Sequence, residues 1–290
     1  MKQSLLQIMQ ARMPEFSKGQ RLIAQYILAH YDRAAYMTAS KLGATVEVSE
    51  STVVRFANEL GFDGYPDLQR ALQELIRNRL TSVQRMEVTS DQVGEGNILH
   101  KVLNLDIEKI RRTMEKASVE DFEQAVDTIV NAKNIYILGV RSASALSGFM
   151  SFYFNQIFES VRLVNTTSTS EMFEQIMRIK EGDVFIGITF PRYSKRTVNA
   201  ANFAKQNGAK VIAITDSNIS PIAETADHLL LARSDMASFV DSLVAPLSVI
   251  NALIVAVGIR KKDEISSTYE RLEQIWDEYN VYEKIEEPRR

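Results

Sequence analysis

The sequence contains no cysteine among its 290 residues. Disulfide bonds and thiol chemistry are therefore excluded, and a reducing compartment such as the cytoplasm suits the chain. Its first twenty residues also lack the sustained apolar stretch and small-residue cleavage site of a secretory signal, which argues against export. We expect a cytoplasmic protein.

Long hydrophobic runs are also missing. The longest one, residues 243–259, is interrupted by Pro246, Ser248 and Asn251 and is short for a membrane span. It predicts a buried or interface helix and no membrane segment. The sequence likewise lacks metal-ligand spacing, a Walker phosphate-binding loop and a dinucleotide Gly-x-Gly-x-x-Gly motif. No metal and no cofactor are expected.

The length predicts two domains, since 290 residues with 45% hydrophobic content can form two sizeable cores. A polar, glycine-containing stretch predicts a linker at residues 81–100, between domains at residues 1–80 and 101–290. Residues 1–80 carry ten Lys or Arg against eight Asp or Glu, and the remainder carries 24 against 29. The positive net charge of residues 1–80 suits DNA binding by the first domain. The excess is small, so affinity would depend on a few well-placed cations and on dimeric binding.

Residues 50–60 have the apolar spacing of an amphipathic helix, behind the N-cap candidate Ser49. Apolar residues recur at positions i, i+3, i+4 and i+7 and share one face, which must be buried. The opposite face carries groups that can donate or accept hydrogen bonds. The apolar positions are Val53, Phe56, Ala57 and Leu60, and the polar ones are Ser51, Thr52, Arg55 and Asn58.

A shorter helix is predicted just before it, with Thr38 as N-cap and with Leu42 and Gly43 on its buried side. Only residues 47–49 separate the two helices, which suits a helix-turn-helix whose second helix lies in the major groove of DNA. A plain helical hairpin is the alternative that the periodicity leaves open. A helix at residues 17–35 is expected to brace the pair. Its core-facing residues are expected to be Leu22, Ile23, Tyr26, Ile27 and Ala29.

The residues on either side of the second helix are distinctive. Val48-Ser49 precedes it, Thr52-Val53 and Arg55 lie within it, and Leu60-Gly61-Phe62-Asp63-Gly64-Tyr65 follows it. This combination resembles the N-terminal domain of RpiR-type bacterial transcriptional regulators over roughly residues 1–80. The resemblance implies binding to double-stranded operator DNA. The candidate DNA-binding residues are Thr38, Lys41, Ser49, Ser51, Thr52, Arg55 and Asn58.

The rest of the chain alternates short apolar strands with helices, including a short helix at residues 220–226. This alternation calls for a parallel sheet covered on both faces, which is a doubly wound α/β domain. Such sheets bind ligands in the crevice beyond the carboxyl ends of their strands. The strands are predicted at residues 134–140, 161–164, 183–189, 210–215 and 227–231.

Two predicted loops leave these carboxyl ends and run into helices, at residues 139–144 and 189–197, and a third small-residue loop lies at 165–170. Backbone N–H groups and hydroxyls converge there, which favours an anion. Alone, each loop could be an ordinary N-capping turn. Together the first two place four cations at one edge, which is costly unless they meet a phosphate or carboxylate. The candidate effector-binding residues are Arg141, Ser142, Ser144, Thr189, Arg192, Ser194, Lys195, Arg196 and Thr197.

Four stretches within this half are also distinctive: ILGVRSASALS, DVFIGITF, GAKVIAITDSNISPIAETADHLL and SFVDSLVAPLSVINALIVAVGI. They resemble a sugar isomerase (SIS) domain, the phosphosugar-binding fold paired with the RpiR-type module, over roughly residues 134–260. The resemblance implies a five-stranded, flavodoxin-like sheet and a sugar phosphate held by Ser142 and Ser144. The second loop departs from the usual Ser-x-Ser-Gly-x-Thr pattern, although Ser194 and Thr197 could still bond an anion. A phosphosugar or a related sugar acid is therefore the expected effector.

An aldose-ketose isomerase is the competing hypothesis, because SIS domains serve both roles. Isomerisation needs a base, commonly Glu or His. His30 and His100 lie outside the predicted crevice, His228 begins the last strand at the opposite edge, and Glu171 and Glu174 fall on a helix face expected to be solvated. A third hypothesis is an SIS adaptor that binds another protein and no DNA. We favour a DNA-binding regulator without catalytic activity.

The SIS resemblance also implies self-association, as a homodimer or tetramer. The apolar segment at residues 239–259 and the helix at 267–282 are expected to supply an interface. Two helix-turn-helix units on one dimer would read a two-fold operator. A ligand in the crevice would change their spacing, and so DNA affinity, only as far as it binds one arrangement better than the other.

Overall fold

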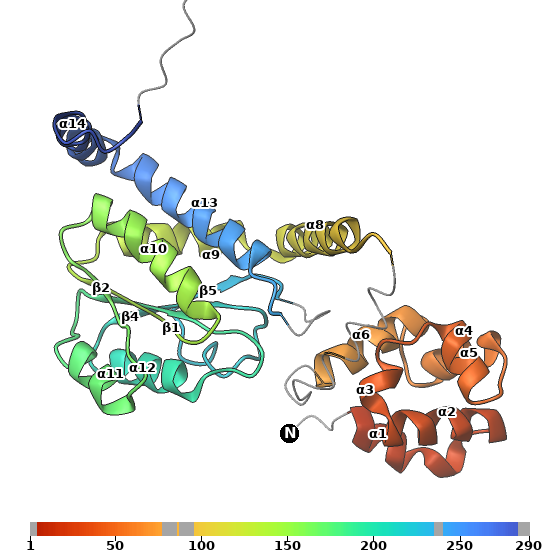
Figure 1. Cartoon of the computed structure of the whole chain (residues 1–290). Coiled ribbons are helices and arrows are strands. Elements are labelled where there is room, and N and C mark those ends of the chain that lie inside the picture. Colours follow the sequence, from red (N-terminus) through yellow and green to blue (C-terminus); the bar gives the residue numbers. More distant parts are fainter. Residues whose placement is uncertain (1–4, 77–85, 87–95, 235–239, 284–290) are drawn as a thin grey trace, which may run out of the picture. The chain divides into compact units, whose positions relative to one another are not determined.

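The structure is a computed structural model that describes residues 5–76, 86, 96–234 and 240–283 (Figure 1). The chain forms two compact units that divide at Ile107 and Glu108, and residues 240–242 belong with the first. Most of the linker predicted at 81–100 lies outside the described residues, as does Phe239 of the expected interface segment. The domain boundaries at residues 80 and 100 stay predictions.

The first unit has an all-helical domain built around one core. Phe16, Ile23, Leu42 and Phe56 are buried in it, and the rings of Phe16 and Phe56 meet edge to face with centroids 5.2 Å apart. This packing buries the apolar face of each helix, as the spacing predicts. The elements are α1 (Leu5–Ala11), the 3-10 helix η1 (Met13–Glu15), α2 (Lys18–Ala29), α3 (Tyr31–Ala34), α4 (Ala39–Thr45), α5 (Glu50–Glu59) and α6 (Tyr65–Ile76).

The prediction of one bracing helix over residues 17–35 is wrong. The helix α2 stops at Ala29, because His30 leaves the helical conformation with φ −136° and the chain restarts as the short α3. Ile23 is buried as expected, but Leu22 is 40% exposed and Ala29 is exposed as well. The brace therefore consists of two helices, α2 and α3, separated by a break at His30.

The second unit contains a parallel sheet with the strand order β2-β1-β3-β4-β5. This is the flavodoxin-like order of doubly wound folds, so the predicted fold class is confirmed. The helix α8 (Ile98–Lys116) leads into it from the first unit. The other elements are α9 (Val119–Val130), β1 (Ile135–Gly139), α10 (Ala143–Ile157), β2 (Val161–Leu163), α11 (Thr169–Ile176), β3 (Val184–Ile188), α12 (Lys195–Gln206), β4 (Lys210–Thr215), β5 (His228–Leu231), α13 (Val244–Arg260) and α14 (Lys262–Glu278).

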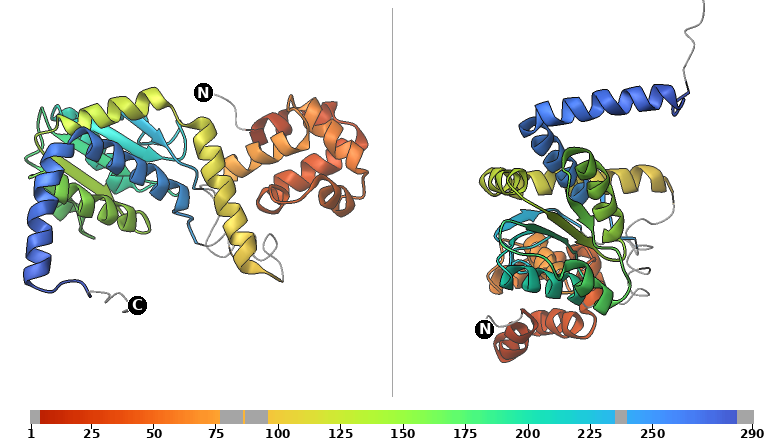
Figure 2. Two further views of the ribbon diagram at one scale, coloured as in Figure 1. Left: turned by 90° about the horizontal axis from the view of Figure 1, so that it is seen from above. Right: turned by 90° about the vertical axis from the view of Figure 1, so that its left-hand side faces the viewer.

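Helices cover both faces of this sheet (Figures 1 and 2). On one face Ile137 and Ile186 pack in a core with Phe154 of α10, together with α9 and α13. On the other face Leu138 and Phe185 pack in a second core with residues of α11 and α12. Because neighbouring residues of a strand point to opposite faces, two cores require apolar residues at every position. This requirement explains the unbroken apolar runs of β1 and β3.

The helix predicted at residues 220–226 is wrong. The segment is a series of turns, in which the N–H of Ala223 donates to the carbonyl of Ser220 (2.9 Å) and that of Thr225 donates to Ile222 (3.2 Å). These are bonds between residues three apart that do not continue into an α-helical ladder. The segment still places Ile222 in the core.

The apolar segment at residues 243–259 forms α13, which is buried along one side through Ile250, Leu253 and Val257. Its prediction as a buried or interface helix is confirmed. No single helix in the described ranges has the length and hydropathy to cross a membrane. The helices α13 and α14 reach that length and hydropathy only as a pair, with a bend of 97° between them.

Candidate nucleic-acid interface and effector site

The helices α4 and α5 form the predicted helix-turn-helix. The hydroxyl of Thr38 accepts the N–H of Lys41 (3.1 Å), and the hydroxyl of Ser49 accepts the N–H of Thr52 (3.3 Å). Both N-cap predictions are therefore confirmed. In the turn between the helices, Glu47 has the left-handed φ of 58°. A residue with a Cβ rarely adopts this conformation, so the surrounding contacts must hold the turn in place.

Gly43 sets how closely α4 approaches this turn. Its carbonyl accepts the N–H of Val48 (2.9 Å), and a Cβ added at Gly43 would lie 2.8 Å from the carbonyl oxygen of Val48. We therefore expect Gly43→Ala to force the helices apart and to lower the free energy of unfolding by about 1–3 kcal/mol in urea denaturation. The matched change at the exposed neighbour, Ala44→Ser, should alter it by less than about 0.5 kcal/mol. Equal stability of both variants would contradict this packing.

The polar side of α5 is available to solvent. Ser51, Arg55 and Asn58 are exposed, and the Nε of Arg55 donates to the carbonyl of Ser51 (3.3 Å). Thr52 is only half exposed, because its methyl group packs beside Gly19 of α2. Its hydroxyl lies 2.9 Å from that of Ser49. The structure thus brings the four predicted residues of α5 and its N-cap Ser49 together, with Thr52 at their buried margin.

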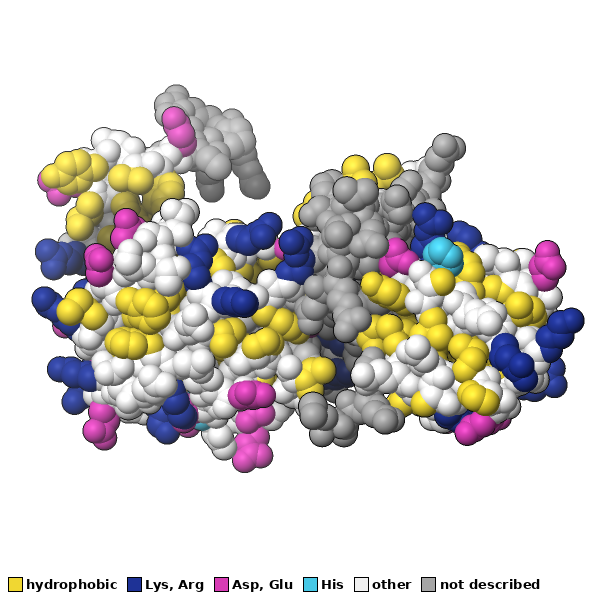
Figure 3. All heavy atoms as spheres, turned by 90° about the horizontal axis from the view of Figure 1, so that it is seen from below, with side chains coloured by type: hydrophobic (Ala, Val, Ile, Leu, Met, Phe, Trp, Pro, Cys, Tyr) yellow, Lys and Arg dark blue, Asp and Glu magenta, His cyan; other side chains and the backbone are white. Residues whose placement is uncertain are grey.

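Two of the predicted DNA-binding residues are exposed cations. Lys41 is exposed with Thr38 on the first turn of α4, and Arg55 is exposed on α5. On the face drawn in Figure 3, Lys and Arg side chains lie scattered among acidic and uncharged ones. Binding to a polyanion would therefore depend on individually placed cations, as the nearly balanced charge of residues 1–80 indicates.

The structure adds Arg12, which the sequence analysis did not single out. Its guanidinium donates to the backbone carbonyl of Glu59 (2.7 Å) and to the carboxylate of the same residue (2.9 Å), at the C-terminal end of α5. A cation is favourable there because the carbonyl end of a helix is partially negative. Arg12 also lies 5.9 Å from the ring centroid of Phe16. Forty-seven positions separate Arg12 from Glu59, so no local pattern reveals the contact.

The candidate effector site lies where the chain leaves β1 and β3. These strands are neighbours, with Gly139 paired to Ile188. After β1 the chain enters α10 on one face of the sheet, and after β3 it enters α12 on the other. This divergence is the topological switch point, at which doubly wound sheets bind ligands. Both loops predicted to hold an effector start there.

The first loop is compact and strained. Arg141 has the left-handed φ of 58°, and the hydroxyl of Ser144 donates to its carbonyl (2.6 Å). A Cβ on Gly139 would lie 2.4 Å from the carbonyl oxygen of Ala143, so only glycine lets α10 start this close to the strand. Arg141, Ser142 and Ser144 are all exposed. Such strain is often found at ligand sites.

The second loop is closed by its own hydroxyl groups. The N–H of Ser194 donates to the hydroxyl of Thr189 (3.1 Å), and the hydroxyl of Ser194 caps α12 by accepting the N–H of Thr197 (3.5 Å). Arg192 has a φ of 66°, and Arg192 and Lys195 are exposed. Thr189 and Thr197 are buried and support the loop from within. Direct contact of these two with a ligand stays a prediction.

A contact made by Arg196 joins the third loop to this edge. Its guanidinium donates to the carbonyl of Thr166 (3.1 Å), which follows β2. The hydroxyl of Thr166 in turn bonds the carboxylate of Glu171 on α11. Of the four cations predicted at the edge, Arg196 therefore holds two loops together, whereas the other three side chains are exposed.

Tyr193 and Asp216 are a second pair that the sequence analysis missed. The phenol of Tyr193 donates to Asp216 Oδ1 (2.9 Å), and Thr215 donates to the same oxygen (3.3 Å). Asp216 follows β4 and is 4% exposed. The bond ties the loop after β3 to the end of β4, across twenty-three positions of sequence.

Removing the hydrogen bond between Tyr193 and Asp216 should lower the stability of the fold. We expect Tyr193→Phe to lower the free energy of unfolding by about 1–2 kcal/mol in thermal denaturation, because a buried carboxylate loses a donor. Tyr269→Phe is the matched control, since the phenol of Tyr269 donates to Gln156 (2.6 Å) between exposed groups. That change should cost less than about 0.5 kcal/mol. The structural role of Tyr193 would be refuted by equal losses in both variants.

Comparison with known families agrees with this architecture. The model of the helix-turn-helix domain of the rpiR family matches residues 3–79, and that of the SIS domain matches residues 128–256. The chain belongs to the RpiR family. Both recognised domains and the regulator class expected from the sequence are thereby confirmed.

Relatives of this RpiR-family protein span nearly its whole length. The transcriptional regulator HexR of Escherichia coli (strain K12) is 26% identical over 278 residues, which is 93% of each chain. The sugar isomerase domain of an RpiR transcription factor from Sphaerobacter thermophilus has a TM-score of 0.59 at 24% identity, covering 62% of this chain and 99% of that one. The Vibrio vulnificus NanR protein, solved in complex with ManNAc-6P, has a TM-score of 0.56 at 21% identity, covering 93% and 98%. At these identities the two structures show a shared fold.

Of the three histidines of this RpiR-family protein, His30 and His100 belong to the first unit and His228 belongs to the second. His228 begins β5 at the amino edge of the sheet, where its Nε2 is 2.8 Å from the hydroxyl of Thr128 and burial lowers its pKa. His30 packs against Tyr26, and His100 is exposed on α8. Among the residues considered as a base, only Glu171 and Glu174 of α11 follow the loop after β2.

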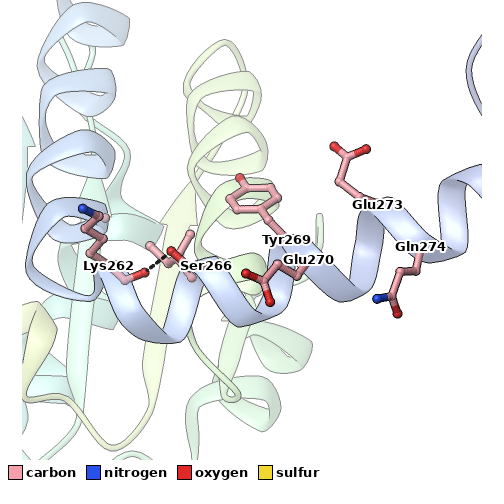
Figure 4. Close-up of a pocket in the computed structure, with 8 residues that line it drawn as sticks. Lys262, Ser266, Tyr269, Glu270, Glu273 and Gln274 are labelled. Carbon is pink, nitrogen blue, oxygen red and sulfur yellow. Dashed lines mark hydrogen bonds between the residues drawn. The ribbon is translucent and has the colours of Figure 1, made fainter.

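An open depression of about 660 Å³ lies elsewhere on the second unit. All of its lining residues belong to α13 or α14, and Figure 4 shows Lys262, Ser266, Tyr269 and Glu270 along α14. The depression is therefore distinct from the edge where β1 and β3 end.

Proposed function

We propose that this RpiR-family regulator binds a two-fold operator as a homodimer, or as a tetramer of two such dimers, and that an anionic sugar derivative controls this binding. Residues 1–80 would bind DNA, residues 101–290 would sense the effector and dimerise, and residues 81–100 would link them. The protein would work in the cytoplasm, where bacterial DNA lies.

The exposed polar side of α5 supports the DNA-binding half of the proposal. Its side chains project from a helix whose other face is fully occupied by core packing of Val53, Phe56 and Ala57. In this role Arg55, Ser51 and neighbouring groups contact base edges or phosphates, since the second helix of such motifs lies in the major groove.

The loops that follow β1 and β3 support the effector-binding half of the proposal. Exposed Arg141, Arg192 and Lys195 surround the start of α10 and α12, where helix N-termini add partial positive charge. A phosphate or carboxylate would relieve this concentration of charge. The NanR protein has the same fold and was solved with the phosphosugar ManNAc-6P, so this fold can hold such a ligand. We therefore propose a phosphosugar or sugar acid as effector.

Binding without catalysis is the activity that this site favours. An isomerase needs a base beside the substrate carbon. His228 begins β5 at the amino edge of the sheet, opposite the proposed site. The carboxylate of Glu171 is exposed and already accepts a hydrogen bond from Thr166. The exposed polar groups of the loops after β1 and β3 are cations and hydroxyls, which suit holding an anion.

The proposal can be tested with the purified full chain. A thermal-shift screen against phosphosugars and sugar acids should give at least one stabilising compound. Selection of bound duplexes from a random DNA pool should return a two-fold symmetric sequence, whose affinity that compound changes. Turnover of any sugar phosphate, or failure to select DNA in the presence and absence of every compound, would contradict the proposal.

A further inference from the structure

The helix α8 carries a line of exposed apolar side chains that the fold itself does not use. Their exposed fractions are 66% for Leu99, 52% for Leu103, 53% for Ile107, 39% for Ile110 and 72% for Met114. Spacings of four, four, three and four residues align them along one side of an α-helix. We call these five residues the α8 stripe.

A different side of α8 is held by the second unit. Lys109 and Thr113 are buried, and the hydroxyl of Thr113 accepts the N–H of Arg233 (2.8 Å). Thr113 is about 100° or more around the helix from Ile107 and Met114, at 3.6 residues per turn. The part of α8 that belongs to the second unit is therefore fixed with Ile110 and Met114 directed outward. Exposed contiguous apolar surface of this kind marks an interaction site.

We infer that the α8 stripe binds the α8 stripe of a second copy of this chain, with the two helices antiparallel. The inference rests on the two-fold assembly proposed above and assigns its interface to α8, in place of the segments at residues 239–259 and 267–282 that the sequence analysis expected. A two-fold interface places one surface against itself, so the surface must be self-complementary. The α8 stripe meets this requirement, because its members lie almost symmetrically about Ile107. Antiparallel pairing sets Leu99 opposite Met114 of the second copy, Leu103 opposite Ile110 and Ile107 opposite itself.

The polar residues beside the α8 stripe support the antiparallel direction. His100, Asn104, Arg111 and Glu115 are all exposed and follow one margin of it. In an antiparallel pair Glu115 meets His100 of the second copy, and Arg111 meets Asn104. In a parallel pair this margin would face the opposite margin of the second copy, so Glu115 would not meet His100.

The absence of cysteine permits a direct test, since each cysteine variant carries one thiol. Under mild oxidation the full-length Ile107→Cys variant should form a disulfide-linked dimer, because the two positions meet at the two-fold axis. Leu103→Cys alone should not, since its copies would lie about 12 Å apart along the helices at 1.5 Å per residue, beyond disulfide reach. A mixture of Leu103→Cys and Ile110→Cys should link. Val119→Cys, 75% exposed on α9, is the control for random collision.

The mass of the protein in solution distinguishes a failure of the α8 contact from a failure of the proposed dimer. Wild-type protein should have the mass of a dimer or tetramer by light scattering, and Ile107→Glu should halve that mass. The circular dichroism spectrum of this variant should be unchanged, because the Ile107 side chain is half exposed within one chain. A wild-type monomer would overturn both this inference and the dimer of the proposed function. If the wild type is dimeric but Ile107→Cys does not link, or if Leu103→Cys links to itself, the antiparallel contact is wrong and the regulator proposal stands.

Discussion

Arg55→Ala is expected to weaken specific operator binding severely without lowering the melting temperature. Arg55 is exposed, and its hydrogen bond to the carbonyl of Ser51 is weak at 3.3 Å, so the fold loses little. A well-placed arginine contact to a base contributes about 1–3 kcal/mol, and a dimer loses two of them. Operator affinity should fall by at least about 30-fold, since about 1.4 kcal/mol corresponds to tenfold. Fluorescence anisotropy with the selected duplex measures the loss.

Arg33→Ala provides the matched control for this variant. Arg33 is also an exposed arginine of the first domain, but it lies on α3, outside the helix-turn-helix. Its removal should change operator affinity by less than about threefold, and both variants should keep a cooperative melt. If Arg55→Ala retained wild-type affinity, α5 would not be the helix that enters the groove.

Arg192→Glu is expected to remove the response to the effector and to leave operator binding by the free protein intact. The substitution replaces a cation with an anion beside the start of α12, where the proposed ligand carries negative charge. A hydrogen bond to a charged group contributes about 1.5–3 kcal/mol, so effector affinity should fall by at least about tenfold. The left-handed φ of 66° is equally unfavourable for arginine and glutamate, so the exchange adds no backbone strain. Calorimetry with the compound found by thermal shift gives the affinity.

Arg178→Glu makes the same change of charge on another part of the second unit. Arg178 is exposed beyond the end of α11, which leads to the amino end of β3 and away from the proposed site. Its effector affinity should stay within about twofold of the wild type, because charges separated by more than about 10 Å are largely screened at 0.1 M salt. Equal losses in both variants would indicate a general effect of charge and would place the ligand elsewhere.

The sequence was most informative where a residue acts on its own neighbours. Thr38 and Ser49 cap the helices they precede, because each needs only a backbone N–H three positions away. The apolar strands predicted a buried parallel sheet, and Val53, Phe56 and Ala57 predicted the buried side of α5. Prediction failed at residues 17–35 and 220–226, because a helical composition does not reveal that His30 leaves the helical conformation or that the bonds after Ser220 join residues only three apart.

The sequence by itself determined the class of this protein: two distinctive motifs, joined in one chain, identify an RpiR-type helix-turn-helix and an SIS domain. It also determined which loops leave the strand ends, because strand order along the chain follows from apolar spacing. The tertiary structure alone decided that β1 and β3 are neighbours, that Tyr193 ties two loops through Asp216, and that Arg12 fixes the end of α5. The reason is physical. These contacts join residues far apart in sequence, and only the packed fold brings them together.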